Sequence, residues 1–303
     1  MYQIKKNPPM RKFAFTFLIF FVFLADCLEA QSVVGYRYLQ DSLSRLSSEI
    51  WKQKTDSARL QASEVLFHKF QKILEASEPE TMPFDSVQGI SQVASINGKL
   101  RIFTWNVPLS DGTSRYYGFL QLVTDDLVII PLRSIAYQKD DFTSRQFTPH
   151  GWYGALYYKL IENEINGQKT YTLLGWDGLT GSSNRKIIDV LTIGMEGKVQ
   201  FGLPVFKTAR GIQNRVEIEY AENSNFLLRY DYQVVKIQKK KKVKKVPAWL
   251  IVMDRLVPMD PSMQGMQKYY VPSGDTYDAF WFKDGFWVFV EDIEVANNPV
   301  KSR

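Results

Sequence analysis

The sequence has little cysteine: Cys27 is the only one in 303 residues. No disulfide can form within the chain, and beyond residue 27 no thiol nucleophile or thiolate metal site is available. A chain without disulfides depends on its hydrophobic core, and a chain of this length is long enough to build one. Sulfur chemistry is therefore excluded for most of the protein.

Histidine is nearly as scarce, with only His68 and His150. Neither lies in an HExxH or another paired spacing that would hold a metal ion. The sequence also lacks GxSxG, a P-loop, and a GxGxxG turn after a strand. We therefore expect no metal and no cofactor, we assign no catalytic residue, and we favour a non-enzymatic protein.

Long apolar runs are confined to the N-terminal region. Thirteen uncharged residues, 13–25, follow four basic side chains: Lys5, Lys6, Arg11 and Lys12. This layout is typical of a signal peptide, and Asp26 ends the run before the roughly 20 residues that a membrane-spanning helix needs. We expect cleavage of residues 1–30 after Ala30, no transmembrane span in the mature chain, and export to the periplasm rather than to the cell surface or the medium.

Cys27 offers an alternative to simple cleavage. The sequence "LADC" is similar to a lipoprotein signal, in which a lipid is attached to the cysteine. Asp26 is a poor fit to the small uncharged residue that such a signal needs before the cysteine. A lipid anchor at Cys27 is therefore the lesser expectation.

Unbalanced charge is limited to one segment. The formal net charge is +6, and residues 1–30 carry four basic and two acidic side chains, which leaves +4 for the remainder. Seven lysines lie within residues 236–245, and without them the remainder would be −3. The basic character therefore belongs to this run and not to the whole surface.

Residues 36–77 have apolar side chains at helical spacing. The two sets are Leu39, Leu43, Leu46 and Ile50, then Leu60, Phe67, Phe70 and Leu74. Thr55 and Asp56 between them are typical of a helix start. We predict two amphipathic helices.

From about residue 88 onward, short β-rich runs alternate with turn signals. Asn166-Gly167 and Asp284-Gly285 each separate two such runs, and both dipeptides are strong hairpin signals. We count ten or eleven strands joined by short links, which favour antiparallel neighbours.

We therefore predict an α+β, mainly β fold. A helical pair in residues 31–85 precedes a large antiparallel β-sheet domain in residues 86–295, in the form of a curled sheet, a sandwich or a barrel. A flexible tail is expected at 296–303. Four aromatic residues should belong to a terminal hairpin: Trp281, Phe282, Phe286 and Trp287.

Tryptophans in the strand region suggest a ligand site. Aromatic strand residues are ordinarily core, but an exposed tryptophan can stack on a sugar ring. Trp152 and Trp176 each adjoin a glycine-rich turn, and Asp177 follows Trp176 in the polar stretch "GWDGLTGSSN". We predict Trp152, Trp176 and Asp177 as ligand-binding residues.

The lysine run lies between two β-type runs, 227–237 and 248–256. This context predicts a long hairpin with a charged, solvated end, which also discourages edge-to-edge association. The functional alternative is binding to lipopolysaccharide or a membrane surface. The residues concerned are Lys239, Lys240, Lys241, Lys242, Lys244 and Lys245. Nucleic acid is disfavoured, because the rest of the chain is net negative and carries no nucleic-acid motif.

Several runs occur together within residues 95–293: "RIFTWNVPLSDGTSRYYGF", "GWYGALYYKL", "YTLLGWDG", "KIIDVLTI" and "YDAFWFKDGFWVFVEDI". As a set they resemble a group of uncharacterised exported β-rich proteins of the Bacteroidota. The resemblance implies an envelope location and a β-rich fold. It implies no site residue, because the group has no assigned activity.

Three functions stay open. The first is a non-enzymatic cell-envelope protein that binds a protein or a glycan, which the missing catalytic motifs favour. The alternative is a hydrolase of polysaccharide or peptidoglycan, which needs two carboxylates facing each other at about 5–10 Å. The lesser alternative is an anionic-surface binder that uses the lysine run.

Overall fold

The protein is described by a computed structural model that covers residues 35–76, 84, 87–135, 142–178, 183–194, 197–239 and 242–295. The predicted signal peptide, Cys27 and the predicted tail at 296–303 lie outside these residues. Within the described ranges, no helix is long and apolar enough to cross a membrane.

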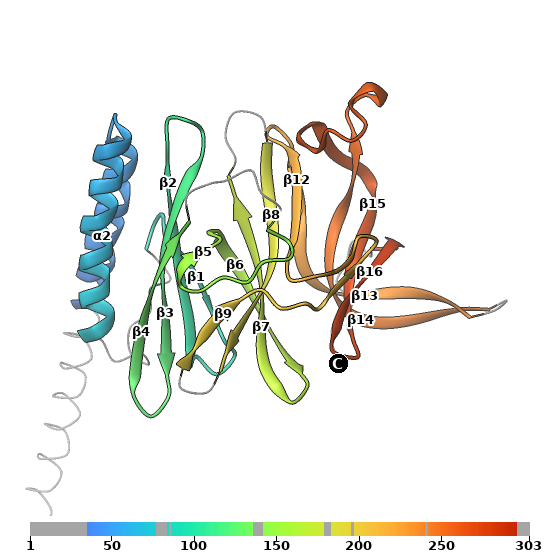
Figure 1. Cartoon of the computed structure of the whole chain (residues 1–303), viewed down its shortest axis with the longest axis horizontal. Helices are drawn as coiled ribbons and strands as arrows, with labels where there is room; N and C mark the ends of the chain where they lie inside the picture. The colour runs from blue at the N-terminus through green and yellow to red at the C-terminus, as the bar shows by residue number, and fades with distance from the viewer. Residues whose placement is uncertain are drawn as a thin grey trace, which may run out of the picture.

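Two helices form the N-terminal layer, as predicted. The first covers residues 35–52 of the described chain, and α2 covers Asp56–Ala76. The Thr55 side-chain oxygen accepts the backbone N–H of Ala58 at 3.3 Å and so caps the start of α2. Phe70 of α2 is fully buried against Phe103 of the adjoining sheet. The apolar stripes seen in the sequence therefore face the first sheet (Figure 1).

The first sheet, sheet A, has the strand order β1-β2-β3-β4-β5. Its neighbours are antiparallel except for β4 and β5, which are parallel. The strands are β1 (Ser91–Ala94), β2 (Leu100–Pro108), β3 (Ser114–Val123), β4 (Leu127–Ser134) and β5 (His150–Trp152).

The second sheet, sheet B, has the order β12-β8-β7-β6, with β9 paired to β8. All its pairs are antiparallel. The strands are β6 (Leu156–Ile165), β7 (Gln168–Asp177), β8 (Ser183–Ile193), β9 (Val199–Phe201) and β12 (Val216–Ala221).

The third sheet, sheet C, has the order β11-β10-β16-β15-β14-β13. A single bridge between Val234 and Glu294 brings the end of β16 beside β13, so this sheet is strongly curled. The strands are β10 (Phe206–Thr208), β11 (Gly211–Gln213), β13 (Leu228–Lys239), β14 (Lys242–Pro258), β15 (Tyr270–Lys283) and β16 (Phe286–Ile293). Two short 3-10 helices, η2 (Pro261–Met263) and η3 (Gln267–Tyr269), separate β14 from β15.

The layers follow one another from the helices through sheets A, B and C (Figure 1). Separate hydrophobic clusters fill the space between the helices and sheet A, between sheets A and B, and between sheets B and C. A fourth cluster lines the concave side of the curled sheet C. The predicted mainly antiparallel α+β fold is therefore confirmed, as stacked sheets that are not closed into a barrel.

Both predicted hairpin turns are present. Asn166 and Gly167 have φ values of 52° and 76°, and they join β6 to β7. Asp284 and Gly285 have φ values of 51° and 78°, and they join β15 to β16. Positive φ at both central residues is the feature that two-residue hairpin turns need and that Asn-Gly and Asp-Gly supply.

Candidate functional site

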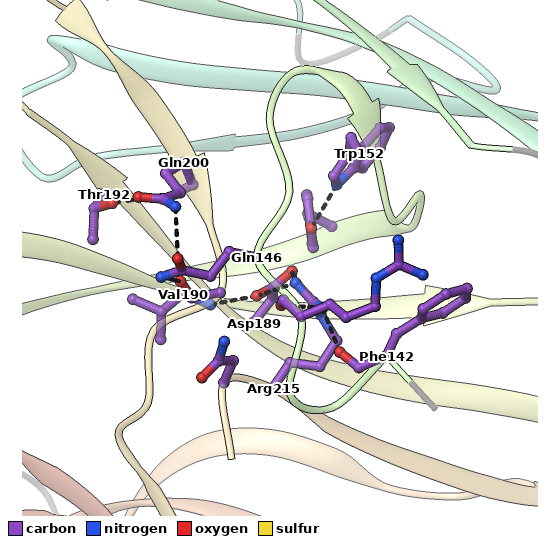
Figure 2. Close-up of polar contacts among 12 residues, drawn as sticks. Phe142, Gln146, Trp152, Asp189, Val190, Thr192, Gln200 and Arg215 are labelled. Carbon is purple, nitrogen blue, oxygen red and sulfur yellow. Dashed lines mark hydrogen bonds and ion pairs between the residues drawn. The ribbon is translucent and has the colours of Figure 1, made fainter. Parts of the chain in front are cut away.

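A fully buried ion pair lies in sheet B. Asp189 is in β8 and Arg215 comes directly before β12, and both side chains are 0% exposed. The Arg215 Nη2 is 2.8 Å from Asp189 Oδ2, and its Nε is 3.1 Å from the same oxygen (Figure 2). Burial raises the pKa of Asp189, and the attraction to the Arg215 guanidinium opposes this rise. The pair is matched in charge and needs no ligand.

Arg215 also fixes the segment that precedes β5. Its Nη1 donates to the backbone carbonyl oxygens of Phe142 at 2.9 Å and Arg145 at 3.2 Å. In the same region the Gln200 side-chain amide donates to Gln146 at 2.9 Å (Figure 2). The ion pair therefore ties residues 142–147 to sheet B, which is a structural role.

A second buried carboxylate, Asp177 at the end of β7, accepts hydrogen bonds from two tyrosine hydroxyls. The hydroxyl of Tyr116 donates to Asp177 Oδ1 at 2.8 Å, and the hydroxyl of Tyr153 donates to Oδ2 at 3.0 Å. The Tyr116 oxygen in turn accepts the Gly178 N–H at 2.9 Å, and the Tyr153 oxygen accepts Arg185 Nη1 at 3.2 Å. Asp177 therefore holds together β3, β7 and the segment before β6.

Burial shifts the pKa values of Asp177 and of its two tyrosine partners. It raises the pKa of Asp177, while the tyrosine hydrogen bonds and Arg185 oppose the rise. Burial together with the Asp177 carboxylate raises the pKa of Tyr116 and Tyr153 well above 10. The two phenols are therefore neutral hydrogen-bond donors at physiological pH.

The cavity beside Asp177 is small. It measures about 20 Å³ and is lined by Ser114, Tyr116, Ile135, Phe142, Tyr153, Asp177 and Arg185. That volume holds about one water molecule and not a sugar ring. Arg185 donates to Tyr153 on one side and lies 3.5 Å from the Glu217 carboxylate on the other. A cation therefore separates Asp177 from this acid, unlike the open facing pair that a glycosidase needs.

Of the three predicted ligand residues, Asp177 lines this cavity, whereas Trp152 and Trp176 are not among its lining residues. Trp152 is fully buried, and its indole N–H donates to the Tyr157 hydroxyl at 2.9 Å (Figure 2). Trp176 is partly buried, with its ring against Gly178, where an added Cβ would lie 2.5 Å from the indole. Trp152 presents no ring face to solvent here, and the ligand-binding assignment of these residues stays a prediction.

The lysine run lies in the β13–β14 hairpin, as the flanking sequences predict. The register places Lys236 opposite Lys245 and Lys239 opposite Lys242. Lys240 and Lys241 lie outside the described residues, and Lys245 is exposed. The hairpin extends away from the stacked sheets, on the side opposite the helices (Figure 1). The register of the hairpin therefore sets lysine opposite lysine at two positions, and Lys245 is exposed on it.

Aromatic rings lie on the same ribbon, closer to the sheet. Trp249 of β14 is 45% exposed, and its ring stacks on Tyr230 at a centroid distance of 5.0 Å and an interplanar angle of 22°. Tyr232, directly opposite Trp249 in the register, lies 5.5 Å from it at 59°. The sequence does not distinguish Trp249 from the other tryptophans of the strand region. Its position just after the lysine run was the available signal.

Two further findings concern metal ions and known proteins. Among the residues described, no group of three or more histidine, cysteine, aspartate and glutamate side chains is placed to hold a metal ion. No protein-family model matches the chain, and no curated protein or solved structure matches it significantly.

Proposed function

We propose that this protein is an exported, non-enzymatic binding protein that attaches to polyanionic material of the cell envelope through its β13–β14 hairpin. The register of the hairpin carries the proposal. Lys236 faces Lys245 and Lys239 faces Lys242. Like charges directly opposite on paired strands destabilise the pair. An external anion would relieve this repulsion.

Solubility alone explains this register less well. A hairpin end with alternating lysine and glutamate would be equally polar and would stabilise itself. The β6–β7 hairpin has that form, since Lys169 lies opposite Glu164 and its Nζ is 2.6 Å from Glu162. In residues 236–239 and 242–245 the register sets no acidic residue opposite a lysine, which favours a binding role.

The hydrolase alternative gains no support at Asp177. The cavity there has room for about one water, and Arg185 lies between Asp177 and Glu217. The structure offers no observation that favours catalysis at this position. Export and envelope location rest on the N-terminal sequence and stay predictions.

Titration with long-chain sodium polyphosphate tests the proposal. The protein should bind it, and the affinity should fall steeply between about 50 and 200 mM salt, because lysine–phosphate contacts release counterions. Replacing Lys236, Lys239, Lys242 and Lys245 by serine should weaken binding by roughly 100-fold or more, at up to about 1 kcal/mol per lysine.

The matched control removes four exposed lysines at the helical end: Lys52, Lys54, Lys69 and Lys72. These four substitutions should change polyphosphate binding less than about threefold, since they lie on the far side of the molecule (Figure 1). An equal loss in both variants would mean that only net charge matters, and the hairpin proposal would fail.

A further inference from the structure

We infer that the loop between β14 and β15 is a Cu(I) site, with the thioether sulfurs of Met259, Met263 and Met266 as its ligands. The loop lies outside the β13–β14 hairpin, so the inference goes beyond the proposed function and does not depend on it. The scarcity of histidine and cysteine predicted no metal, but thioethers are a separate class of ligand that suits soft monovalent copper.

The three methionines of this loop are not core residues. Methionine is ordinarily buried and fills gaps in a core, as Met253 of β14 does at 5% exposure. By contrast, Met259 is 59% exposed, Met266 is 52% exposed, and Met263 is only partly buried. Neither of the short helices in the loop, η2 and η3, has a buried residue. Packing therefore does not explain why three methionines occur within eight residues here.

Backbone hydrogen bonds close the loop and bring the methionines together. The Met259 N–H donates to the Tyr269 carbonyl oxygen at 3.0 Å, and the Tyr269 N–H donates to the Met266 carbonyl oxygen at 3.0 Å. The Met266 N–H donates to the Met263 carbonyl oxygen at 3.0 Å, which closes a turn whose end Cα atoms lie within about 7 Å. Because a methionine side chain has several rotatable bonds, the exposed sulfurs can turn toward a common ion.

The charged groups of the loop do not favour a hard cation. Asp260 accepts the backbone N–H of Ser262 at 2.9 Å and its hydroxyl at 2.6 Å, and so caps η2. Lys268 balances the charge of Asp260, so residues 259–269 carry no net charge. A divalent ion would gain little electrostatic attraction from such a loop. A monovalent ion held by neutral sulfurs needs none.

The ligand type also selects the metal. Zinc is bound through thiolate, imidazole or carboxylate groups, and Cu(II) prefers nitrogen and oxygen ligands. Residues 259–269 contain no histidine and no cysteine. The loop therefore favours Cu(I), and Ag(I), a redox-inert ion of similar softness, binds in the same way.

Competition with a coloured Cu(I) chelator, under anaerobic conditions with ascorbate, measures the affinity of the purified protein. The protein should take up a single Cu(I) that excess Zn(II) does not displace. Exchanging Met259, Met263 and Met266 together for leucine removes the sulfurs at nearly constant volume. This variant should lose more than the roughly 10–100-fold that follows removal of an outer-shell partner of a metal site. The matched control is Met253→Leu, which should bind Cu(I) as the unaltered protein does.

Methyl NMR of protein labelled at the methionine methyl groups locates the metal. Ag(I) should shift the resonances of Met259, Met263 and Met266 together, and leave that of Met253 in place. If only one of the three resonances shifts, or if the triple leucine variant retains full Cu(I) affinity, the inference is overturned. The triple variant should still bind polyphosphate, so failure of the copper site is distinguishable from failure of the proposed function.

Discussion

Sheet B and the β13–β14 hairpin handle charge in opposite ways. In sheet B, Asp189 meets Arg215 at 2.8 Å, Glu162 meets Lys169 at 2.6 Å, and Glu217 meets Arg185 at 3.5 Å. In the hairpin, lysines face lysines at two positions of the register. The ion pairs of sheet B are therefore matched within the protein, whereas the register of the hairpin sets lysine opposite lysine.

Buried charges and solvent-exposed charges are subject to different physical requirements. Buried charges must be matched, because an isolated charge out of water is very costly. Charges on a solvated ribbon are free to remain unmatched, because water and salt screen them. The buried Asp189–Arg215 pair ties residues 142–147 to sheet B, and under our proposal the opposed lysines are the residues that an external partner would engage.

The largest expected loss of stability comes from removing the counter-charge of the buried Asp189 carboxylate in sheet B. Arg215→Met leaves the buried Asp189 carboxylate without its counter-charge and should lower the free energy of unfolding by about 3–5 kcal/mol. Chemical denaturation measures it. Arg255→Met is the control, because the Arg255–Asp278 pair is partly exposed and should contribute only about 0–1 kcal/mol. Equal losses in the two variants would contradict the account.

The Asp177 carboxylate, which accepts hydrogen bonds from two tyrosines, should contribute less to stability than the Asp189–Arg215 pair. Asp177→Ala removes the acceptor of two buried tyrosine hydroxyls and should cost about 1–3 kcal/mol. Thermal unfolding of Asp177→Ala, with Tyr116→Phe/Tyr153→Phe as a companion, measures this. The companion should lose more than Asp177→Ala, because it leaves a buried carboxylate without its two donors, and an orphaned charged group costs more than orphaned hydroxyls. A companion that loses less would show that the carboxylate is not held by the two phenols.

The raised pKa of Asp177 predicts a pH dependence of stability. Burial raises the folded-state pKa of Asp177 above its unfolded value, so the folded state holds a proton that the unfolded state releases between the two pKa values. The stability contributed by this group is present below the unfolded pKa and is lost as the pH rises through the folded pKa. The melting temperature of the protein relative to Asp177→Asn should therefore rise as the pH falls from 7 toward 4. A constant difference would mean that the pKa of Asp177 is not raised.

The smallest effect should come from giving the hairpin the charge pattern of sheet B. Lys236→Glu with Lys239→Glu creates two opposite-charge pairs in the register. It should stabilise the hairpin by about 0.2–1 kcal/mol per pair at low salt and abolish polyphosphate binding. Hydrogen exchange of hairpin amides measures the first effect. The converse change, Glu164→Lys opposite Lys169, should destabilise β6–β7 by a similar amount. A double-glutamate hairpin that exchanges faster would argue against repulsion in the original.

The local elements could be predicted from the sequence, because their causes are local. Helical spacing around Phe67 and Phe70, and the dipeptides Asn166-Gly167 and Asp284-Gly285, each act within a few residues. The bounds of the lysine hairpin followed in the same way from the β-type runs on either side.

The buried hydrogen-bond partners could not be predicted, because they are far apart in the sequence. Asp189 and Arg215 are 26 residues apart, and Tyr116 and Asp177 are 61 apart. Exposure of a tryptophan depends on where one layer ends and the next begins. Trp152, beside a glycine turn, is buried between sheets A and B, whereas Trp249 lies where β13 and β14 run out beyond the stack.

Hydrogen–deuterium exchange of the unaltered protein, with and without long-chain polyphosphate, tests the central claim most directly. Binding should slow exchange in peptides from residues 228–258, because the anion screens the opposed lysines and stabilises their strand pair. Peptides from residues 156–177, which hold the internally matched β6–β7 hairpin, should not change. Protection that appears elsewhere and leaves residues 228–258 unchanged would contradict the account.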